Sequence, residues 1–410
     1  MRWLTNVRLP QAHRCRHGQD QRWRLGLERI RHDDGPGAVE RIRVIEPIDS
    51  GSAAAGEDWG GDWLSPMGVD LQINGGLGLP FPELTAADLP RLQELQALLW
   101  RDGVEAICPT LVTCGVAPLR QALAVLAEAR LSDQRDPTGQ RCRLLGAHLE
   151  GPFLAPARRG AHPQQHLAGP SLEALSERID GFSCGPGWSG EGTALRHDIS
   201  LVTLAPELEG AEAVIRRLRA SGVVVSLGHS AASEEQAKAA FAAGVGMLTH
   251  AFNAMPGLHH RAPGPIAAAV GESAVALGLI ADGVHVAPAM AVLLQQLAPE
   301  QVVLVSDALA PYGLGEGQHR WDERLLIVAD GSCRLDDNTL AGTTLPLLEG
   351  VKRLGHWSGE PGRAIAAATV LPRRWLGDRR ELRALLQGRR LDHCLRWQAG
   401  EEGPIWRALA

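Results

Sequence analysis

Short runs of apolar or β-branched residues alternate with longer amphipathic stretches between residues 69 and 307. This alternation is typical of repeated strand–helix units, in which a helix covers each buried strand of a parallel sheet. Eight such runs predict an α/β protein whose main part is a (β/α)₈ TIM-like barrel. The predicted strands are 69–73, 106–112, 144–149, 199–204, 223–227, 246–249, 274–280 and 302–306.

Several of the intervening helices can be bounded from the sequence. A helix is expected to begin at Ser233, because Gln236 three places later completes a capping box. The Gly, Ser and Trp-rich stretch 181–192 interrupts the pattern, and we expect it to be an insertion on the surface. The apolar spacing predicts further helices over 88–100, 118–129 and 211–220.

The two ends of the chain differ from this pattern. Residues 1–64 carry scattered short apolar patches, and 345–410 hold helix-like segments followed by a basic, Trp-containing tail. We therefore expect a small β-sandwich domain assembled from 1–64 and 345–410, beside a barrel that occupies 65–344.

Composition narrows the class of protein. Of 410 residues, 45% are hydrophobic and 21% charged, an ordinary globular balance that excludes a disordered or fibrous chain. The formal net charge of -6 argues against a nucleic-acid partner held by bulk electrostatics.

The first thirty residues contain no continuous apolar stretch, so we predict neither a signal peptide nor a membrane span and expect a cytoplasmic protein. Seven cysteines without a Cys-x-x-Cys pair favour reduced, structural thiols.

Unusual polar residues lie at the carboxyl ends of the predicted strands. In a (β/α)₈ barrel all these ends open onto one face, where the active site forms. Residues far apart in the sequence are therefore expected to converge. In chain order they are Gln72, Asn74, His148, Glu150, Glu207, His229, His250, Asp282, His285 and Asp307.

This set includes one carboxylate and two imidazoles, those of Glu150, His229 and His250. Such a combination of ligands suits zinc or another borderline divalent ion. A single histidine is more simply interpreted as a hydrogen-bonded structural residue. Buried polar side chains at strand after strand are costly unless they bind something, which favours the metal site. Asp307 follows a very apolar strand and would lie opposite, free to take a proton. Asp282, in Ala-Asp-Gly, is interpreted first as a turn residue.

Seven motifs then occur in order between about residues 66 and 350. Together they resemble the N-acetylglucosamine-6-phosphate deacetylase family of amidohydrolases. The motifs are GAHLEGPFL at 146–154, TLAPE at 203–207, SLGHS at 226–230, THAFNAMP at 249–256, ADGVH at 281–285, VSDA at 305–308 and LAGT at 340–343.

The resemblance implies a chemical role for five residues in or near these motifs. Glu150, His229 and His250 match the family's metal ligands, and Asp307 matches its catalytic acid/base. His162 matches a residue that contacts the acetamide group of the substrate and would help to polarise it; outside the family it would be interpreted as a solvated loop histidine.

The resemblance also implies how the substrate is bound. Asn253 and Ala254 match contacts to the sugar phosphate, although Asn253 alone would be interpreted as a cap or turn residue. Arg261 and His285 match phosphate-binding positions. Because Arg261 in the family is presented to a neighbouring subunit's site, the resemblance implies a homodimer.

Many amidohydrolases carry His-x-His after the first strand and hold a second metal ion. This chain has Gln72-Ile-Asn74 there, and neutral amides are poor zinc ligands beside imidazole and carboxylate. We therefore expect one divalent ion, Zn²⁺ with Fe²⁺, Co²⁺ or Mn²⁺ as alternatives, and assign Gln72 and Asn74 to substrate binding. The ends of the chain depart from the family: an Ala-Asp signature is not recognisable around 391–393.

The resemblance implies hydrolysis of N-acetyl-D-glucosamine 6-phosphate to D-glucosamine 6-phosphate and acetate, with a small amino-sugar phosphate as partner and neither nucleic acid nor membrane. Two alternatives stay open. The first is another amidohydrolase, dihydroorotase-like or dipeptidase-like, acting on a related N-acyl sugar or a cyclic amide. The second is a non-catalytic barrel that binds sugar phosphates, since fold and motif do not prove turnover.

Overall fold

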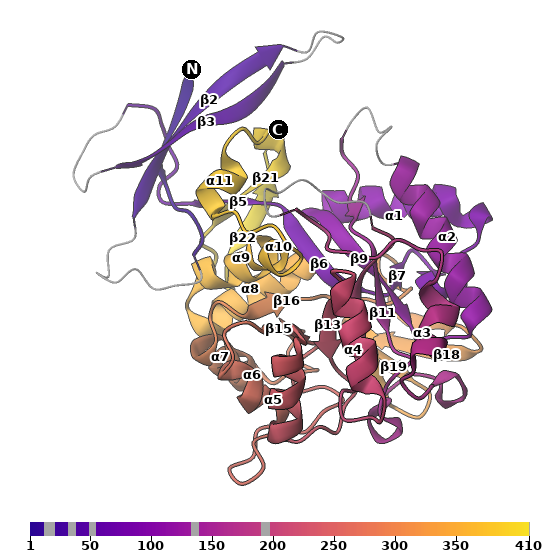
Figure 1. Ribbon diagram of the computed structural model, residues 1–410. Helices are drawn as coiled ribbons and strands as arrows, with labels where there is room; N and C mark the ends of the chain where they lie inside the picture. Colours follow the sequence, from indigo (N-terminus) through magenta and orange to yellow (C-terminus); the bar gives the residue numbers. More distant parts are fainter. Residues whose placement is uncertain (12–20, 32–37, 49–54, 133–138, 190–196, 410) are drawn as a thin grey trace.

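A computed structural model describes residues 1–11, 21–31, 38–48, 55–132, 139–189 and 197–409. The chain folds into a large barrel, with a smaller β-rich part beside it that holds both termini (Figure 1). The predicted fold class, a (β/α)₈ barrel with a small domain from both ends, is confirmed.

The barrel strands are all parallel, and each predicted run overlaps at least one of them. The third run is split in two at Leu145 and Gly146, where the backbone turns with a φ of 100° at the glycine. In their order around the barrel the strands are β6 (Gly68–Ile73), β9 (Val104–Val112), β10 (Arg143–Leu144) with β11 (Ala147–Glu150), β12 (Ile199–Leu204), β13 (Val224–Leu227), β14 (Met247–Leu248), β15 (Ala276–Leu279) and β16 (Val302–Leu304).

Backbone hydrogen bonds close the barrel between its first and last strands. The amide of Asp307 donates to the carbonyl of Gln72 at 2.9 Å, and the amide of Asn74 donates to the carbonyl of Ala308 at 2.7 Å. These two hydrogen bonds hold the segment of Gln72 and Asn74 next to the segment of Asp307, and both segments carry predicted site residues.

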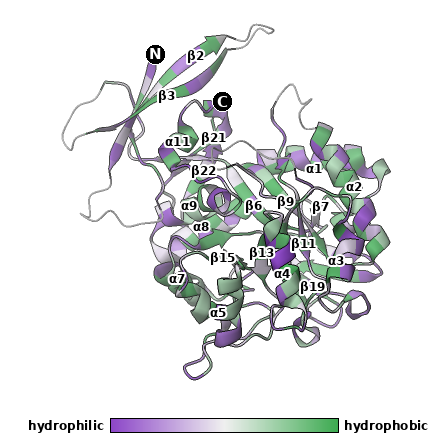
Figure 2. Cartoon of the chain, viewed as in Figure 1, coloured by the Kyte–Doolittle hydropathy of each residue, from purple (hydrophilic) through white to green (hydrophobic). Residues whose placement is uncertain are grey.

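The strands are apolar because they are buried on both faces. All nine residues of β9 and all six of β12 are buried, as expected where helices cover a parallel sheet. Green, hydrophobic ribbon accordingly concentrates in the barrel (Figure 2). The covering helices are α1 (Leu89–Arg101), α2 (Val116–Ser132), α3 (Leu172–Ile179), α4 (Ala211–Ala220), α5 (Glu234–Ala243), α6 (Gly264–Val270), α7 (Pro288–Leu297), α8 (Leu347–Ser358), α9 (Pro361–Thr369) and α10 (Leu371–Trp375).

The predicted start of α5 is confirmed in detail. The Ser233 hydroxyl accepts from the amide of Gln236 at 3.2 Å, and the Gln236 side chain accepts from the amide of Ser233 at 2.9 Å. This capping box stabilises the first turn of the helix that follows His229.

An antiparallel sheet that the sequence pattern did not predict follows β16. Its inner face packs Trp321, Leu326 and Cys333 against Val112 and Leu309 at the mouth of the barrel. The sheet therefore forms one wall of the carboxyl-terminal face. Its strands are β17 (Gly317–Trp321), β18 (Arg324–Ala329), β19 (Ser332–Leu335) and β20 (Leu340–Thr343).

The small β-rich part has a core of its own drawn from both ends of the chain, with Leu4 and Leu25 packed beside Leu386 and Leu391. The division of the chain at 64/65 and 344/345 stays a prediction; the helices α8 and α9 that follow 344 pack on barrel strands. The strands of this part are β1 (Arg2–Val7), β2 (Arg22–Arg31), β3 (Ala38–Ile48), β4 (Glu57–Asp58), β5 (Trp63–Pro66), β21 (Cys394–Gln398) and β22 (Ile405–Ala408), with helix α11 (Leu382–Leu386) beside them.

The prediction of a surface insertion at 181–192 is wrong for its central residues. Trp188 is 2% exposed and packs with Leu145 and Leu376, and its amide donates to the Leu376 carbonyl at 2.9 Å. The indole belongs to a buried cluster that also contains the barrel residues Val69 and Val303, so composition alone misled the prediction. Residues 190–192 lie outside the described part, as does Cys15, while the other six cysteines are free thiols.

Among the described residues, no helix combines the length and apolar character needed to cross a bilayer.

Candidate metal centre and active site

All of the predicted site residues except Gln72 and Arg261 line a cavity of about 320 Å³ at the carboxyl ends of the strands. Glu150 ends β11, His229 and His250 follow β13 and β14, and Asp307 follows β16. All four side chains are buried. Those of the predicted residues that line the cavity are Asn74, Glu150, His162, His229, His250, Asn253, Ala254, His285 and Asp307.

Three side-chain atoms form the centre of the site. Oε1 of Glu150 lies 3.1 Å from Nε2 of His229 and 3.1 Å from Nε2 of His250, and the two nitrogens are 3.1 Å apart. Ligand atoms about 2.1 Å from a tetrahedral zinc lie roughly 3.4 Å from one another, so this spacing fits a single cation. Nε2 of His162 is farther away, at 4.0 Å from the same oxygen.

The proton on His229 explains why these atoms need a cation. Its Nδ1 lies 2.9 Å from the carbonyl oxygen of Arg158, which can only accept a hydrogen bond. Nδ1 therefore carries the proton of the neutral ring, and Nε2 presents a lone pair to Glu150 and His250. Lone pairs that face one another at 3.1 Å repel unless a cation lies between them.

Charge interactions keep the carboxylate ionised. Burial raises the pKa of Glu150, but its close contacts with the rings of His229 and His250 outweigh burial and hold that pKa well below its ordinary value. Burial lowers the pKa of His250, whereas its contact with Glu150 raises the pKa and prevails. Burial, reinforced by His229, lowers the pKa of His162 so that its ring is neutral.

Two amides hold Asp307 beside this centre. Nδ2 of Asn74 donates to Oδ1 of Asp307 at 2.7 Å. Nε2 of Gln72 lies 3.2 Å from both Oδ1 of Asp307 and Oε1 of Glu150, so it links the two carboxylates. Burial and the charge of Glu150 raise the pKa of Asp307 to about 7, which places its protonation close to neutral pH.

His162 lies in the wall of the cavity and is oriented from behind by Thr113. The Thr113 hydroxyl and amide lie 3.0 Å and 3.3 Å from Nδ1 of His162. With Nδ1 engaged, Nε2 is the nitrogen that faces the cavity and Glu150.

Residues predicted to bind phosphate do not all reach this cavity. His285 does, and its Nδ1 donates to Asp282 at 2.6 Å, so Asp282 orients that ring as well as setting a turn. The side-chain amide of Asn253 donates to the carbonyls of His250 and Ala251 at 3.2 Å, which also gives it the role of a turn residue.

Arg261 is exposed on the connection between β14 and α6, and does not line the cavity of its own chain. This connection projects away from the barrel at the lower left of Figure 1.

Two polar residues singled out from the sequence have structural contacts instead. His148 lies below the cavity, bonded to Thr203 at 2.7 Å, and burial lowers its pKa to about 4. Glu207 accepts from the hydroxyl of Ser230 and the amide of Ala231, which fastens the loop after His229.

Among Glu150, His229, His250 and Asp307, three residues have a strained backbone. His229, His250 and Asp307 have φ values of 47°, 28° and 49°, in the left-handed region that side chains other than glycine rarely adopt. Each such residue costs roughly 1–3 kcal/mol, and such strain gathers at functional sites. Here the turns direct the side chains across the barrel mouth.

Sequence reasoning missed several residues of the site. Trp321 and Ala341 line the cavity from the antiparallel sheet, and Thr113 supports His162. The LAGT motif at 340–343, which contains Ala341, was the one available signal in the sequence. Its last residue, Thr343, accepts and donates backbone hydrogen bonds that hold the Asp307 loop in place.

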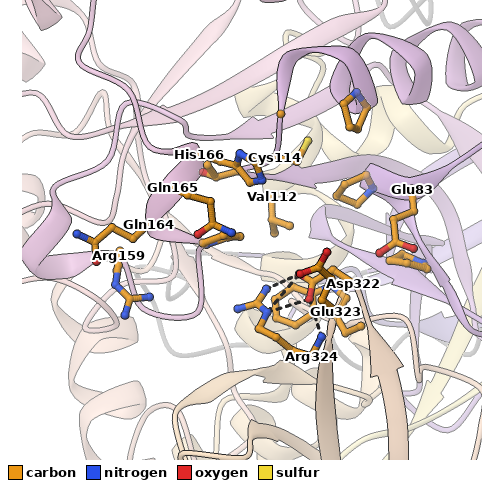
Figure 3. A pocket seen from close by; sticks show the side chains of 17 residues that line it. Glu83, Val112, Cys114, Arg159, Gln164, Gln165, His166, Asp322, Glu323 and Arg324 are labelled. Atoms are coloured by element: carbon orange, nitrogen blue, oxygen red, sulfur yellow. Dashed lines mark hydrogen bonds and ion pairs between the residues drawn. The ribbon is translucent and has the colours of Figure 1, made fainter.

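A larger cavity of about 620 Å³ adjoins this one and shares Val112 and Trp321 with it. Figure 3 shows Arg324 bonded to Asp322, with Arg159 to their left and His166 above them in the view. Neither the carboxylate–imidazole cluster nor Asp307 reaches into it, so the smaller cavity is the candidate active site.

Comparison with known proteins assigns the chain to a protein family. No family model matches the chain. A curated N-acetylglucosamine-6-phosphate deacetylase from Vibrio furnissii is 34% identical over 349 residues, covering 85% of this chain and 82% of the relative. The chain belongs to the N-acetylglucosamine-6-phosphate deacetylase family. An N-acetylgalactosamine-6-phosphate deacetylase from Escherichia coli O157:H7 is also similar, 33% identical over 350 residues, covering 85% of this chain and 86% of the relative.

A solved structure of an N-acetyl-D-glucosamine-6-phosphate deacetylase family member supports the same placement. It is a Mycobacterium smegmatis enzyme variant in complex with N-acetyl-D-glucosamine-6-phosphate. The two chains share 28% identity, with a TM-score of 0.74 and coverage of 98% of this chain and 96% of the other.

Proposed function

We propose that this deacetylase hydrolyses the acetamide of N-acetyl-D-glucosamine 6-phosphate, giving D-glucosamine 6-phosphate and acetate. The observation that carries the proposal is the convergence of Glu150, His229 and His250 at 3.1 Å, with Asp307 tied to Glu150 through Gln72. Family membership supports the reaction, and the solved complex of a relative contains this sugar phosphate.

Glu150, His229 and His250 would hold one divalent ion, for which zinc is the best match among borderline metals. Fe²⁺, Co²⁺ and Mn²⁺ accept the same donor set. When bound, such an ion supplies Lewis acidity, which lowers the pKa of water and polarises a carbonyl oxygen. Gln72 and Asn74 occupy the positions that would hold a second ion, and both donate amide protons toward Asp307 instead.

Asp307 would serve as base and then as acid. Its carboxylate takes a proton from the attacking water as oxygen bonds to the acetamide carbon. The same proton is then delivered to the nitrogen as the carbon–nitrogen bond breaks, because an unprotonated amine leaves poorly. Asn74 and Gln72 hold the carboxylate in position for both transfers.

The remaining residues would position the substrate. His162 presents Nε2 to the acetamide, while His285, Asn253 and Ala254 line the opposite side of the cavity, where the sugar phosphate would lie. Nδ1 of His285 is held by Asp282 at 2.6 Å, which fixes the orientation of the ring at the edge of the cavity.

The two alternatives are not favoured. Dihydroorotase-like and dipeptidase-like enzymes would need ligands for a second ion where Gln72 and Asn74 lie. A non-catalytic barrel would have no use for a buried carboxyl whose pKa is close to neutral beside the metal-binding cluster.

The test is acetate release by the zinc-loaded enzyme on three substrates: N-acetylglucosamine 6-phosphate, its galactosamine epimer and unphosphorylated N-acetylglucosamine. We expect the highest kcat/KM with the first and a large loss without phosphate. A preference for the galactosamine epimer would transfer the assignment to the activity named for the Escherichia coli relative. Absence of acetate release from all three would contradict the proposal.

We also propose that the enzyme acts as a homodimer in which Arg261 reaches the partner's active site. Arg261 is exposed on a projecting connection and outside the cavity of its own chain, as a residue that acts across an interface would be.

A further inference from the structure

A second polar cavity, of about 490 Å³, lies at the opposite end of the barrel from the active site. Its barrel side is formed by Trp100, Glu105 and Arg143, near the starts of β9 and β10. Its other side is formed by Arg41 of β3 and by 385–393, which belong to the small β-rich part. The strand β9 separates the two cavities by on the order of 20 Å.

Arginine dominates the lining of this cavity, which we call the arginine cavity. Glu105 is the one acidic residue among the described residues of the lining. Six described arginines face it: Arg41, Arg141, Arg143, Arg380, Arg389 and Arg390.

The charge of Glu105 is already shared. It pairs with Arg389 at 2.6 Å, with the buried Arg373 at 2.8 Å and with Arg143 at 3.3 Å. Burial raises the pKa of Glu105, but these three guanidinium groups outweigh burial and hold the pKa far below its ordinary value. One carboxylate therefore compensates three cations.

Two further arginines have aspartate partners of their own. Arg380 pairs with Asp378 at 2.8 Å, and Arg390 pairs with Asp392 at 2.6 Å. Arg41 donates to the carbonyl oxygen of Gly388 at 2.9 Å, which is a neutral acceptor. With Arg373 included and Arg141 left aside, six guanidinium groups meet three carboxylates within the part of the chain that the structure describes.

The hydrogen-bond donors that line the cavity favour a phosphate group as the anion that would balance the excess positive charge. A guanidinium fork matches phosphate oxygens in a bidentate way, and several forks around one pocket suit an anion with two or more charges. The ring of His393 packs edge-on against Trp100, 4.8 Å between centroids, and its buried Nε2 meets no partner among the described residues. This nitrogen adds another potential donor.

We propose that the arginine cavity is a second anion site, which binds a small phosphate-bearing molecule between the barrel and the small β-rich part. Arg41 and Arg143 contact the anion from opposite sides. Because the bound anion compensates charge from both parts of the chain, its binding stabilises their contact.

The experiment is calorimetric titration of the metal-loaded enzyme with inorganic pyrophosphate. The test variant is Arg41→Gln with Arg143→Gln, and the control is Arg43→Gln with Arg216→Gln, which removes the same charge from exposed side chains that do not line the cavity. A third variant, His285→Ala, weakens anion binding in the active site alone.

We expect pyrophosphate to bind His285→Ala and the control as it binds the parent, and to bind the test variant roughly tenfold more weakly or worse. The acetate-release activity of the test variant without added anion should match that of the parent. Unchanged binding by the test variant, or loss of all binding in His285→Ala, would overturn the proposal.

Hydrogen exchange on the unaltered enzyme keeps the proposal testable if the test variant does not fold. Pyrophosphate should slow exchange in 385–393 and at the start of β10, and equal exchange with and without it would refute the site. Parallel titrations with glucosamine 6-phosphate and inorganic phosphate then separate the sources: tighter binding of the sugar phosphate supports a metabolite, and equal binding supports free phosphate.

Discussion

The chemistry of this protein depends on where single protons are held. The carbonyl of Arg158 holds the proton of His229 at Nδ1, so that Nε2 can act as a ligand. The Asp307 carboxyl, with a pKa raised to about 7, can both accept and return a proton near neutral pH. A few buried hydrogen bonds thus set the protonation states that hydrolysis requires.

Replacing Asp307 by Asn should separate proton transfer from metal binding. The amide keeps the size of the side chain and its contacts with Asn74, but cannot accept a proton from water. We expect acetate release to fall by about a thousandfold, within the range for general acid–base groups. Metal content measured by atomic emission should stay at the parental level. Near-normal turnover in this variant would refute the assignment.

Thr113→Val should impair the positioning of His162. Valine preserves the shape and removes the hydroxyl that lies 3.0 Å from Nδ1. We expect kcat to fall about tenfold, as for other residues that orient site groups, while KM and metal content change little. A purely structural role would instead lower the melting temperature and leave kcat of the folded protein unchanged.

At the residue scale, the sequence predicted the donors but not what orients them. Glu150, His229 and His250 could be found because each follows a recognisable strand. The carbonyl of Arg158 has no signature, since every residue carries one. Thr113 meets His162 only after two loops, from different strands, fold over the same cavity.

At the scale of elements, short turns with exacting geometry join each strand to its helix. The capping box at Ser233 begins α5 four residues after His229 and limits the conformations open to that loop. Glu207 adds hydrogen bonds from the neighbouring connection. These contacts offset the strain of the left-handed backbone at His229.

Ser233→Ala should show what this cap contributes. Loss of the hydroxyl acceptor is expected to lower the free energy of unfolding by about 1 kcal/mol, measured by urea denaturation. Turnover at 25 °C should be unchanged because the helix stays in place. Ser132→Ala, at the last residue of α2, is the matched control, and an equal loss there would show that the cap has no special role.

Elements with a clear pattern of apolar residues in the sequence were predictable, whereas elements without such a pattern were not. The barrel strands are buried runs of apolar residues, and each predicted run overlaps a strand. The strand β17, in contrast, reads Gly-Gln-His-Arg-Trp with one buried residue, so its place in a sheet depends on pairing with β18. Trp188 was misplaced for the converse reason, because its glycine-rich surroundings resemble a loop.

At the scale of the whole molecule, the barrel separates its two polar ends. Hydrolysis is assigned to the carboxyl-terminal mouth, and the arginine cavity lies at the other end, against the small β-rich part. Within a single chain Arg261 is exposed to solvent. Its proposed role in phosphate binding therefore depends on the proposed homodimer.

Arg261→Ala should weaken phosphate recognition if Arg261 acts across the proposed dimer interface. We expect kcat/KM for the phosphorylated sugar to fall roughly ten- to hundredfold, with little change for unphosphorylated N-acetylglucosamine. The exposed Arg216→Ala on α4 serves as the control. An equal loss on both sugars would contradict the role.

Co-expression of Arg261→Ala with Asp307→Asn chains tests whether the arginine acts across the interface. A mixed dimer has one site with Asp307 from one chain and Arg261 from the other, so activity should exceed that of either variant alone. No gain in a preparation shown by sedimentation to contain mixed dimers would refute the proposed geometry.

The central claim is that Glu150, His229 and His250 hold a single divalent ion on which hydrolysis depends. Its most direct test is acetate release from N-acetylglucosamine 6-phosphate by metal-depleted enzyme, measured against added equivalents of zinc. The account predicts no activity without metal and a linear rise to a plateau at one equivalent per chain. Activity that is independent of added metal, or a plateau at two equivalents, would contradict it.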